Sequence, residues 1–201
     1  MKNLLIVLVL IFSEFSYCQT DSQFVQSGFA KYSKEDYKGA IVDYSKAIEL
    51  NPKDSYLYRV RGSSKNNLQD YLGAIADYSK AIELSPKNSV TYYFRGRAKF
   101  ELKDFIGAIA DYSIAIELNP KNPQDTYMLR AVAKCELKDF RGAIADCSKE
   151  IVLNPKDNYA YYFRGIAKIN VGQKDSACLD WSKAGELGEA DAYEMIKKYC
   201  N

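Results

Sequence analysis

Apolar and small residues recur along this chain at helical spacing, in paired segments joined by short polar turns. Between about Val90 and Leu102, aromatic residues, glycine and alanine fall three and four residues apart, which predicts a helix. Asp104 interrupts the pattern, and a second helix is predicted from Phe105 to about Leu118. Pro120 ends that helix, because proline cannot continue the hydrogen-bond ladder. The pattern therefore predicts a pair of helices joined by a turn.

The same helix pair returns every 34 residues. The stretch Gly73–Pro86 follows a near-copy at Gly39–Pro52 and precedes others at Gly107–Pro120 and Gly142–Pro155, the last shifted by one residue. A fixed period of this size is typical of stacked helical repeats. Pro123 is inserted before the fourth repeat, and residues 192–201 are left over. The five predicted repeats are 21–54, 55–88, 89–122, 124–157 and 158–191.

Small and large residues alternate at fixed positions of each repeat. Position 20 is alanine in all five repeats, and position 8 is glycine in four of them. Small residues there allow neighbouring helices to approach closely, while large residues at positions 4 and 24 lock the contact. Position 8 holds Gly28, Gly62, Gly96, Ala131 and Gly165, and position 24 holds Tyr44, Tyr78, Tyr112, Cys147 and Trp181.

This pattern resembles the tetratricopeptide repeat family, which has an aromatic residue at position 4, glycine or alanine at 8, alanine at 20 and 27, an aromatic residue at 24 and proline at 32. The resemblance covers residues 21–191. It implies an all-α fold, a right-handed α-solenoid of about five helix-turn-helix repeats whose first helices line a concave groove. Three departures stand out: Ser27 where other repeats carry arginine, Glu150 in place of the position-27 alanine, and Gly188-Glu189 in place of Asn-Pro.

The C-terminal end is predicted to close the solenoid. Residues 192–201 are expected to form a capping helix, because a solenoid end exposes an apolar face that must be covered. The last repeat and this tail look like the closing unit of exported bacterial proteins with such repeats, which implies a disulfide between Cys178 and Cys200. By the chain-entropy model such a bridge contributes on the order of 3 kcal/mol. Cys135 and Cys147 are expected to be buried thiols.

The N-terminal end, residues 1–18, is predicted to be a signal peptide. Lys2 precedes an apolar run, Leu4–Phe12, that is too short to span a bilayer. Cleavage after Cys18 would leave a repeat domain over residues 19–191, and the protein would be exported, either periplasmic or secreted. The alternatives are an uncleaved anchor and a lipoprotein signal, which the bulky Tyr17 does not suit. Membrane association is expected only if Cys18 is lipidated.

Arginine and aspartate recur beside the packing positions. An arginine among packed helices needs a partner, because an unpaired buried charge is costly. We predict a ladder of structural ion pairs, either within a repeat (Arg61 with Asp77) or between repeats (Arg61 with Asp43). The first geometry leaves Asp43 without a partner, and the second leaves Asp180 without one; a phosphate-binding stripe is the alternative. The members are Arg61, Arg95, Arg130, Arg164, Asp43, Asp77, Asp111, Asp146 and Asp180.

Composition excludes several functions. The chain has no histidine, which removes Ser-His-Asp and Cys-His nucleophilic sites and zinc sites that need imidazole. Its 28 basic and 26 acidic residues give a net charge of +2, with no electrostatic footprint for nucleic acid. Glycines fall singly at packing positions, so no phosphate loop is present. We expect no catalytic residues, no metal site, no cofactor and no nucleic-acid partner.

Family geometry places positions 2, 5, 9, 12 and 13 of each first helix on the concave wall. Side chains there differ between repeats while packing positions stay fixed, which is typical of a recognition surface, although drift alone also produces variation. Polar donors and apolar side chains are mixed, so the groove suits an extended peptide or protein segment. The predicted groove residues are Arg59, Ser63, Asn66, Asn67, Tyr93, Arg97, Phe100, Met128, Tyr162 and Ile166.

The sequence thus favours a non-catalytic scaffold for protein interactions. Two alternatives stay open: a self-associating structural repeat protein, and an accessory subunit of an envelope complex. Some members of the family grip a C-terminal carboxylate with a clamp of lysine, asparagine and arginine. That clamp is not predicted here, because the matching lysines are absent.

Overall fold

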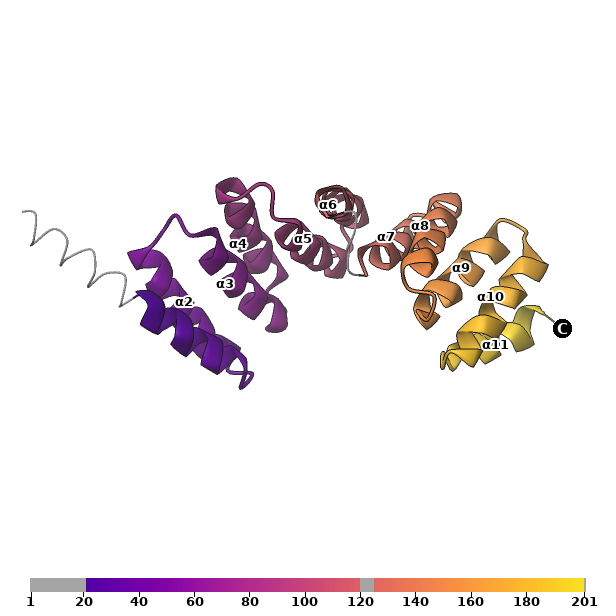
Figure 1. Cartoon of the computed structure of the whole chain (residues 1–201), viewed down its shortest axis with the longest axis horizontal. Helices are drawn as coiled ribbons and strands as arrows, with labels where there is room; N and C mark the ends of the chain where they lie inside the picture. The colour runs from indigo at the N-terminus through magenta and orange to yellow at the C-terminus, as the bar shows by residue number, and fades with distance from the viewer. Residues whose placement is uncertain (1–20, 120–124, 201) are drawn as a thin grey trace, which may run out of the picture. The chain divides into compact units, whose positions relative to one another are not determined.

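The computed structural model describes residues 21–119 and 125–200, and all regular secondary structure within them is helical (Figure 1). The predicted signal peptide and the inserted Pro123 lie outside the described residues. Two compact units are distinguished, one ending at Ala98 and one beginning at Lys99, and each is described by itself. The helices are residues 21–32, α2 (Tyr37–Leu50), α3 (Ser55–Asn67), α4 (Tyr71–Leu84), α5 (Ser89–Glu101), α6 (Phe105–Leu118), α7 (Thr126–Glu136), α8 (Phe140–Leu153), α9 (Asn158–Asn170), α10 (Lys174–Glu186) and α11 (Asp191–Tyr199).

An aspartate starts the second helix of each of the first four repeats. The Asp70 carboxylate accepts a hydrogen bond from the Gly73 backbone N–H at 3.0 Å, which satisfies a donor that the first turn of α4 leaves without an intrahelical partner. A β-carbon on Gly73 would meet that carboxylate, so a larger residue there would have to displace the capping side chain. The four caps are Asp36, Asp70, Asp104 and Asp139.

The core of each repeat depends on a glycine that faces a large ring. A β-carbon on Gly62 would lie 2.9 Å from the fully buried ring of Tyr78, so only glycine admits the ring in this position. Gly28 faces Tyr44 and Gly165 faces Trp181 in the same way. In the fourth repeat both partners change, and this coupled change keeps the shared volume filled. There, Ala131 and Cys147 lie in one apolar cluster.

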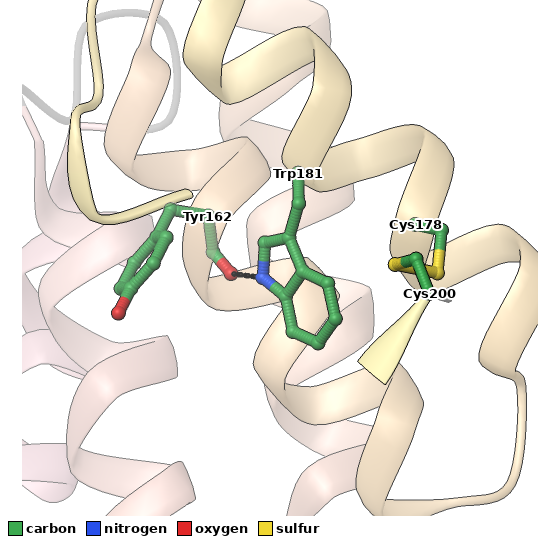
Figure 2. Close-up of a disulfide and its surroundings, with 4 residues drawn as sticks. All are labelled: Tyr162, Cys178, Trp181 and Cys200. Carbon is green, nitrogen blue, oxygen red and sulfur yellow. Dashed lines mark hydrogen bonds between the residues drawn. A yellow bond between two sulfur atoms is a disulfide. The ribbon is translucent and has the colours of Figure 1, made fainter. Parts of the chain in front are cut away.

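The C-terminal helix α11 closes the second unit. Figure 2 shows Trp181 of α10 with its indole Nε1–H directed at the backbone carbonyl of Tyr162, to which it donates at 3.2 Å. The Trp181 ring is fully buried, and the ring of Tyr199 packs against it at 5.7 Å between centroids. A disulfide joins Cys178 of α10 to Cys200, with 5.8 Å between the Cα atoms. The tail therefore covers the apolar end of the last repeat.

The two remaining cysteines of the described chain are free thiols. Cys147 is buried and Cys135 is half-buried against the same cluster. Burial raises the pKa of Cys135 to about 11, and burial likewise raises the pKa of Cys147. Because the thiolate is the reactive form, neither residue is a nucleophile at neutral pH.

The pairing of small residue with large ring can be tested by exchanging the two versions. Gly62→Ala should destabilise the protein by about 1–3 kcal/mol, because the added methyl group overpacks the Tyr78 ring. Cys147→Tyr should also destabilise, and adding Ala131→Gly should recover part of that loss. Urea unfolding of the single and double variants measures the coupling. Equal stabilities for Cys147→Tyr with and without Ala131→Gly would contradict this account.

Candidate functional site

Three of the arginines at position 7 form ion pairs within their own repeats. Arg61 on α3 donates from Nε and Nη2 to the two carboxylate oxygens of Asp77 on α4, at 2.9 and 2.7 Å. Arg130 with Asp146 and Arg164 with Asp180 repeat this two-bonded geometry at 2.8 and 2.7 Å. Of the two geometries that the sequence allowed, these three pairs adopt the one within the repeat. Their guanidinium groups are occupied and do not form an open phosphate-binding stripe.

The third nitrogen of each arginine reaches the preceding repeat. Arg61 donates from Nη1 to the Ser45 hydroxyl at 3.1 Å. The same guanidinium lies over the Tyr58 ring, with 5.7 Å from its central carbon to the ring centroid. Each arginine therefore joins two successive repeats through directed hydrogen bonds. The other serine contacts are Arg95 to Ser79, Arg130 to Ser113 and Arg164 to Ser148, at 2.9–3.2 Å.

A lysine that the sequence analysis missed completes each cluster. Lys65 lies one helical turn after Arg61, and its Nζ contacts an Asp77 oxygen at 2.7 Å. The signal was present in the sequence, since lysine recurs with the period of the repeat and residues four apart share a helix face. All five pairs have the same 2.7 Å distance: Lys31–Asp43, Lys65–Asp77, Lys99–Asp111, Lys134–Asp146 and Lys168–Asp180.

The first repeat corrects one expectation. The sequence argument left Asp43 without a partner, yet Lys31 contacts its carboxylate at 2.7 Å and the Ser27 hydroxyl donates to it at 2.6 Å. Serine stands here in place of arginine, and lysine supplies the charge. Burial alone would raise the pKa of Asp43, but the hydrogen bonds from Lys31 and Ser27 outweigh it and hold the pKa below its usual value.

Removing one of these carboxylates should be costly. Asp77→Asn leaves Arg61 and Lys65 partly buried without a counter-charge, so we expect a loss of about 2–4 kcal/mol in unfolding free energy. Glu83→Gln on the same helix is the control. It breaks an exposed pair with Lys80 and should cost less than about 0.5 kcal/mol. Urea titration compares the two, and similar small losses would contradict a structural role for Asp77.

A pocket of about 250 Å³ lies in the first unit. The helix over residues 21–32, α3 and α5 supply most of its lining, with one ring from α2. On α3 the lining residues fall three and four apart, on one helix face. The lining consists of Phe29, Tyr32, Tyr44, Tyr56, Arg59, Val60, Ser63 and Phe94.

Hydrogen bonds fix the polar edge of this pocket. The Ser63 hydroxyl donates to the Arg59 carbonyl at 3.1 Å and accepts from the Tyr78 hydroxyl at 3.2 Å. Burial raises the pKa of Tyr78 to about 12, so this phenol remains a donor at neutral pH. Asn67 donates from Nδ2 to the Tyr32 hydroxyl at 2.9 Å. Asn66 Oδ1 is buried and accepts no hydrogen bond from the described residues.

Two arginines of the first unit differ from those of the ladder. Arg59 lies over the Tyr56 ring at 5.0 Å, and Arg97 lies over the Tyr93 ring at 5.9 Å. Among the residues that the structure describes, neither arginine contacts a carboxylate, in contrast to the two-bonded pairs of the ladder. Their hydrogen-bonding nitrogens therefore stay available to a ligand.

The predicted groove residues are only partly brought together. Arg59 and Ser63 line the pocket, with Phe29 and Tyr32 from wall positions of the first repeat. Tyr93 is buried with its ring edge against Phe94. Sequence reasoning missed the contribution of position 6, which supplies Val60 and Phe94; the signal was the helical spacing along α3 from residue 56 to residue 63.

The remaining groove residues belong to the second unit. Phe100 meets the ring of Phe105 edge-on at 5.2 Å, and Met128 is half-buried on α7. Tyr162 and Ile166 pack against the cluster that contains Trp181, where the C-terminal helix also docks. In this place they support the closing of the repeat domain.

The fourth repeat buries a carboxylate. Glu150 of α8 has one oxygen without a hydrogen-bond partner in the described structure, and its carboxylate accepts from the Met128 backbone. Burial, followed by repulsion from Asp157 and Asp125, raises the pKa of Glu150 from 4.5 to about 7. The group is thus favoured in its protonated form within the fold.

This shift predicts a pH dependence of stability. Unfolded Glu150 ionises near 4.5 and folded Glu150 near 7, so folding is penalised progressively as pH rises between these values. Glu150→Gln should match wild-type stability at pH 4 and exceed it at pH 8 by on the order of 2 kcal/mol. Thermal unfolding across pH measures this difference, with the exposed Glu117→Gln as control. A constant difference between pH 4 and pH 8 would contradict the buried-carboxylate account.

Within residues 21–119 and 125–200, no three potential ligands among histidine, cysteine, aspartate and glutamate group as a metal site would require. No helix in this part of the chain has both the length and the apolarity to cross a bilayer.

Together, these features define an all-α repeat protein built from helix-turn-helix units. Residues 24–54, 57–88 and 90–122 match the family model of the tetratricopeptide repeat. The chain therefore contains tetratricopeptide repeats. Proteins of this family generally act as non-catalytic scaffolds that bind protein or peptide partners.

Solved structures share the fold. A crystal structure of MamA protein is 26% identical, has a TM-score of 0.79, and covers 87% of this chain and 95% of its own. A MamA fragment from Desulfovibrio magneticus RS-1 is 17% identical with a TM-score of 0.79, over 84% and 94%. YrrB, described as a tetratricopeptide-repeat protein with an unusual peptide-binding site, is 18% identical with a TM-score of 0.77, over 87% and 90%. No curated protein sequence matches the chain.

Proposed function

We propose that this protein is a scaffold that binds an extended peptide or protein segment on its first helices, with the pocket at Phe29, Arg59 and Phe94 as a docking point. The observation that carries the proposal is the pocket itself. Its volume of about 250 Å³ lies below the roughly 300–1,000 Å³ of small-molecule sites. A recess of this size suits one large side chain of a longer ligand.

The polar edge of the pocket supports the same proposal. An extended peptide carries unsatisfied backbone N–H and C=O groups that a groove must meet. Arg59 and Arg97 are donors without a carboxylate partner in the described structure. They lie on the first helices of two successive repeats, so a segment crossing α3 and α5 would meet a donor on each helix. YrrB binds at an unusual peptide site, but at 18% identity that likeness supports only the fold.

We further propose that the protein acts outside the cytoplasm. The disulfide between Cys178 and Cys200 supports this placement, because disulfides persist in oxidising compartments. The predicted signal peptide at residues 1–18 supports it independently. Fractionation of cells into cytoplasm, periplasm and medium tests it: recovery of the chain in the cytoplasm with both cysteines reduced would refute the proposal.

Selection from a random peptide library displayed on phage tests the peptide function. Phe29→Ala should weaken the selected peptides at least 5-fold without changing stability, because this ring lines the pocket yet is 59% exposed. Leu72→Ala, which trims a comparably exposed side chain on α4 outside the pocket, should leave binding unchanged. Selected peptides that bind Phe29→Ala and Leu72→Ala equally well would refute docking at the pocket.

A further inference from the structure

We propose that the pocket in the first unit recognises an acidic segment, in which an apolar side chain enters the pocket while a neighbouring side-chain carboxylate binds Arg59 and Arg97. This inference rests on the proposed function and names the class of its ligand. The expected ligand is an internal stretch of a partner protein, with an aromatic or large aliphatic residue beside aspartate or glutamate.

Two sets of arginines on the same helices differ in whether they have a carboxylate partner. On α3, Arg61 gives two hydrogen bonds to Asp77, and Lys65 adds a third contact. Arg59, two residues earlier and on another face, has no carboxylate partner among the described residues. Arg61, Arg130 and Arg164 of the ladder each have a carboxylate partner, whereas Arg59 and Arg97 have none among the described residues. A guanidinium left without an internal partner is suited to pair with an external one.

The two positive charges, of Arg59 and Arg97, lie on the successive first helices α3 and α5. Tyr78 donates its hydroxyl hydrogen bond to Ser63, which lines the pocket. The charges of both Arg59 and Arg97 act on the Tyr78 hydroxyl and oppose the rise in its pKa that burial causes. Arg59 lines the pocket itself, and Arg97 lies over the ring of Tyr93, which meets the lining residue Phe94 edge-on.

Tyrosine rings orient both arginines before a ligand binds. The Arg59 guanidinium is held over the ring of Tyr56, itself a lining residue, and Arg97 is held over Tyr93. Stacking on a ring face restricts the side chain while leaving the planar N–H edge free. Binding a carboxylate therefore costs such an arginine less side-chain entropy than it would cost a freely rotating lysine.

Several kinds of anion could pair with these arginines, and they differ in how well they also fill the aromatic pocket. A simple anion would leave the aromatic pocket unfilled, and a nucleic acid would require a basic surface that a net charge of +2 does not indicate. A C-terminal carboxylate is the other peptide source of the same charge, but the lysines of the clamp that takes it are absent from this chain. An internal acidic residue next to an apolar one uses both halves of the site.

Peptides of fixed composition test this ligand class. We would measure fluorescence anisotropy of the labelled peptide Ser-Ser-Phe-Glu-Glu-Ser-Ser, acetylated and amidated so that no terminal charge remains. Replacing both glutamates with glutamine should weaken binding roughly 5- to 20-fold, as should replacing phenylalanine with alanine. Raising the salt from 50 to 500 mM should weaken the glutamate peptide more than the glutamine peptide, because only the former depends on charge.

Variants of the protein locate the effect. Arg59→Gln and Arg97→Gln should each weaken the glutamate peptide by about 3- to 10-fold and change the glutamine peptide less than 2-fold. The matched control is Arg141→Gln, which removes one exposed positive charge from α8 and should change neither peptide. A loss that appears equally in Arg141→Gln would show a nonspecific effect of net charge and would overturn the proposal.

The library selection separates this inference from the function on which it rests. Enrichment of acidic residues beside an apolar residue, in peptides that need Phe29, supports both. Peptides that need Phe29 but lack acidic residues, or that need a free C-terminal carboxylate, overturn the acidic ligand and leave peptide binding intact. A selection without peptides that need Phe29 overturns both. Dimerisation in sedimentation velocity that Arg59→Gln abolishes would identify a second copy as occupant and overturn a partner segment.

Discussion

A buried aspartate at position 23 of each repeat is the constraint on which the described structure depends. It holds a lysine in all five repeats and, where the pair is seen in full, an arginine that also reaches back to the preceding repeat. Apolar packing sets how closely the helices approach, but the hydrophobic effect itself is non-directional. Directed hydrogen bonds from a planar guanidinium to two successive repeats fix the register. The aspartate thus stabilises the stacking of the repeats, and its charge is neutralised by partners within its own repeat.

Arg59 and Arg97 lie outside these ion pairs. Arg61 and Arg59 lie two residues apart on α3, yet Arg61 is held by Asp77 whereas Arg59 lies over the Tyr56 ring. Because α3 turns by about 100° per residue, the two side chains face different surroundings. The same helix therefore carries a stacking contact on one face and a free charge beside an aromatic recess on another. Neither arginine differs chemically; the presence or absence of a counter-charge decides its role.

The helix pairs and the packing positions followed from the 34-residue period, because volume and periodicity determine them. The capping helix lies outside that period and followed from the need to cover the apolar end of the last repeat. The sequence left the arginine geometry open, since both pairings satisfy the charge, and only the relative placement of α3 and α4 decides it. The lysine at position 11 was recognisable from its recurrence but was missed. The pocket was less predictable: Val60 and Phe94 stand at a position assigned to neither core nor groove, and their exposure depends on the angle between first helices.

The separation of the two roles has a physical consequence for how such a protein changes its ligand. Gly62 faces the Tyr78 ring and Arg61 is held by Asp77, so replacing one member of either pair disturbs its partner, and the effects on stability within a pair are coupled. Phe29 and Arg59 contribute little to that network, because one is largely exposed and the other has no ion-pair partner in the described chain. Substitutions at the pocket can therefore alter the charge and shape presented to a ligand while the stacking of the repeats, and with it the position of the pocket's walls, stays the same.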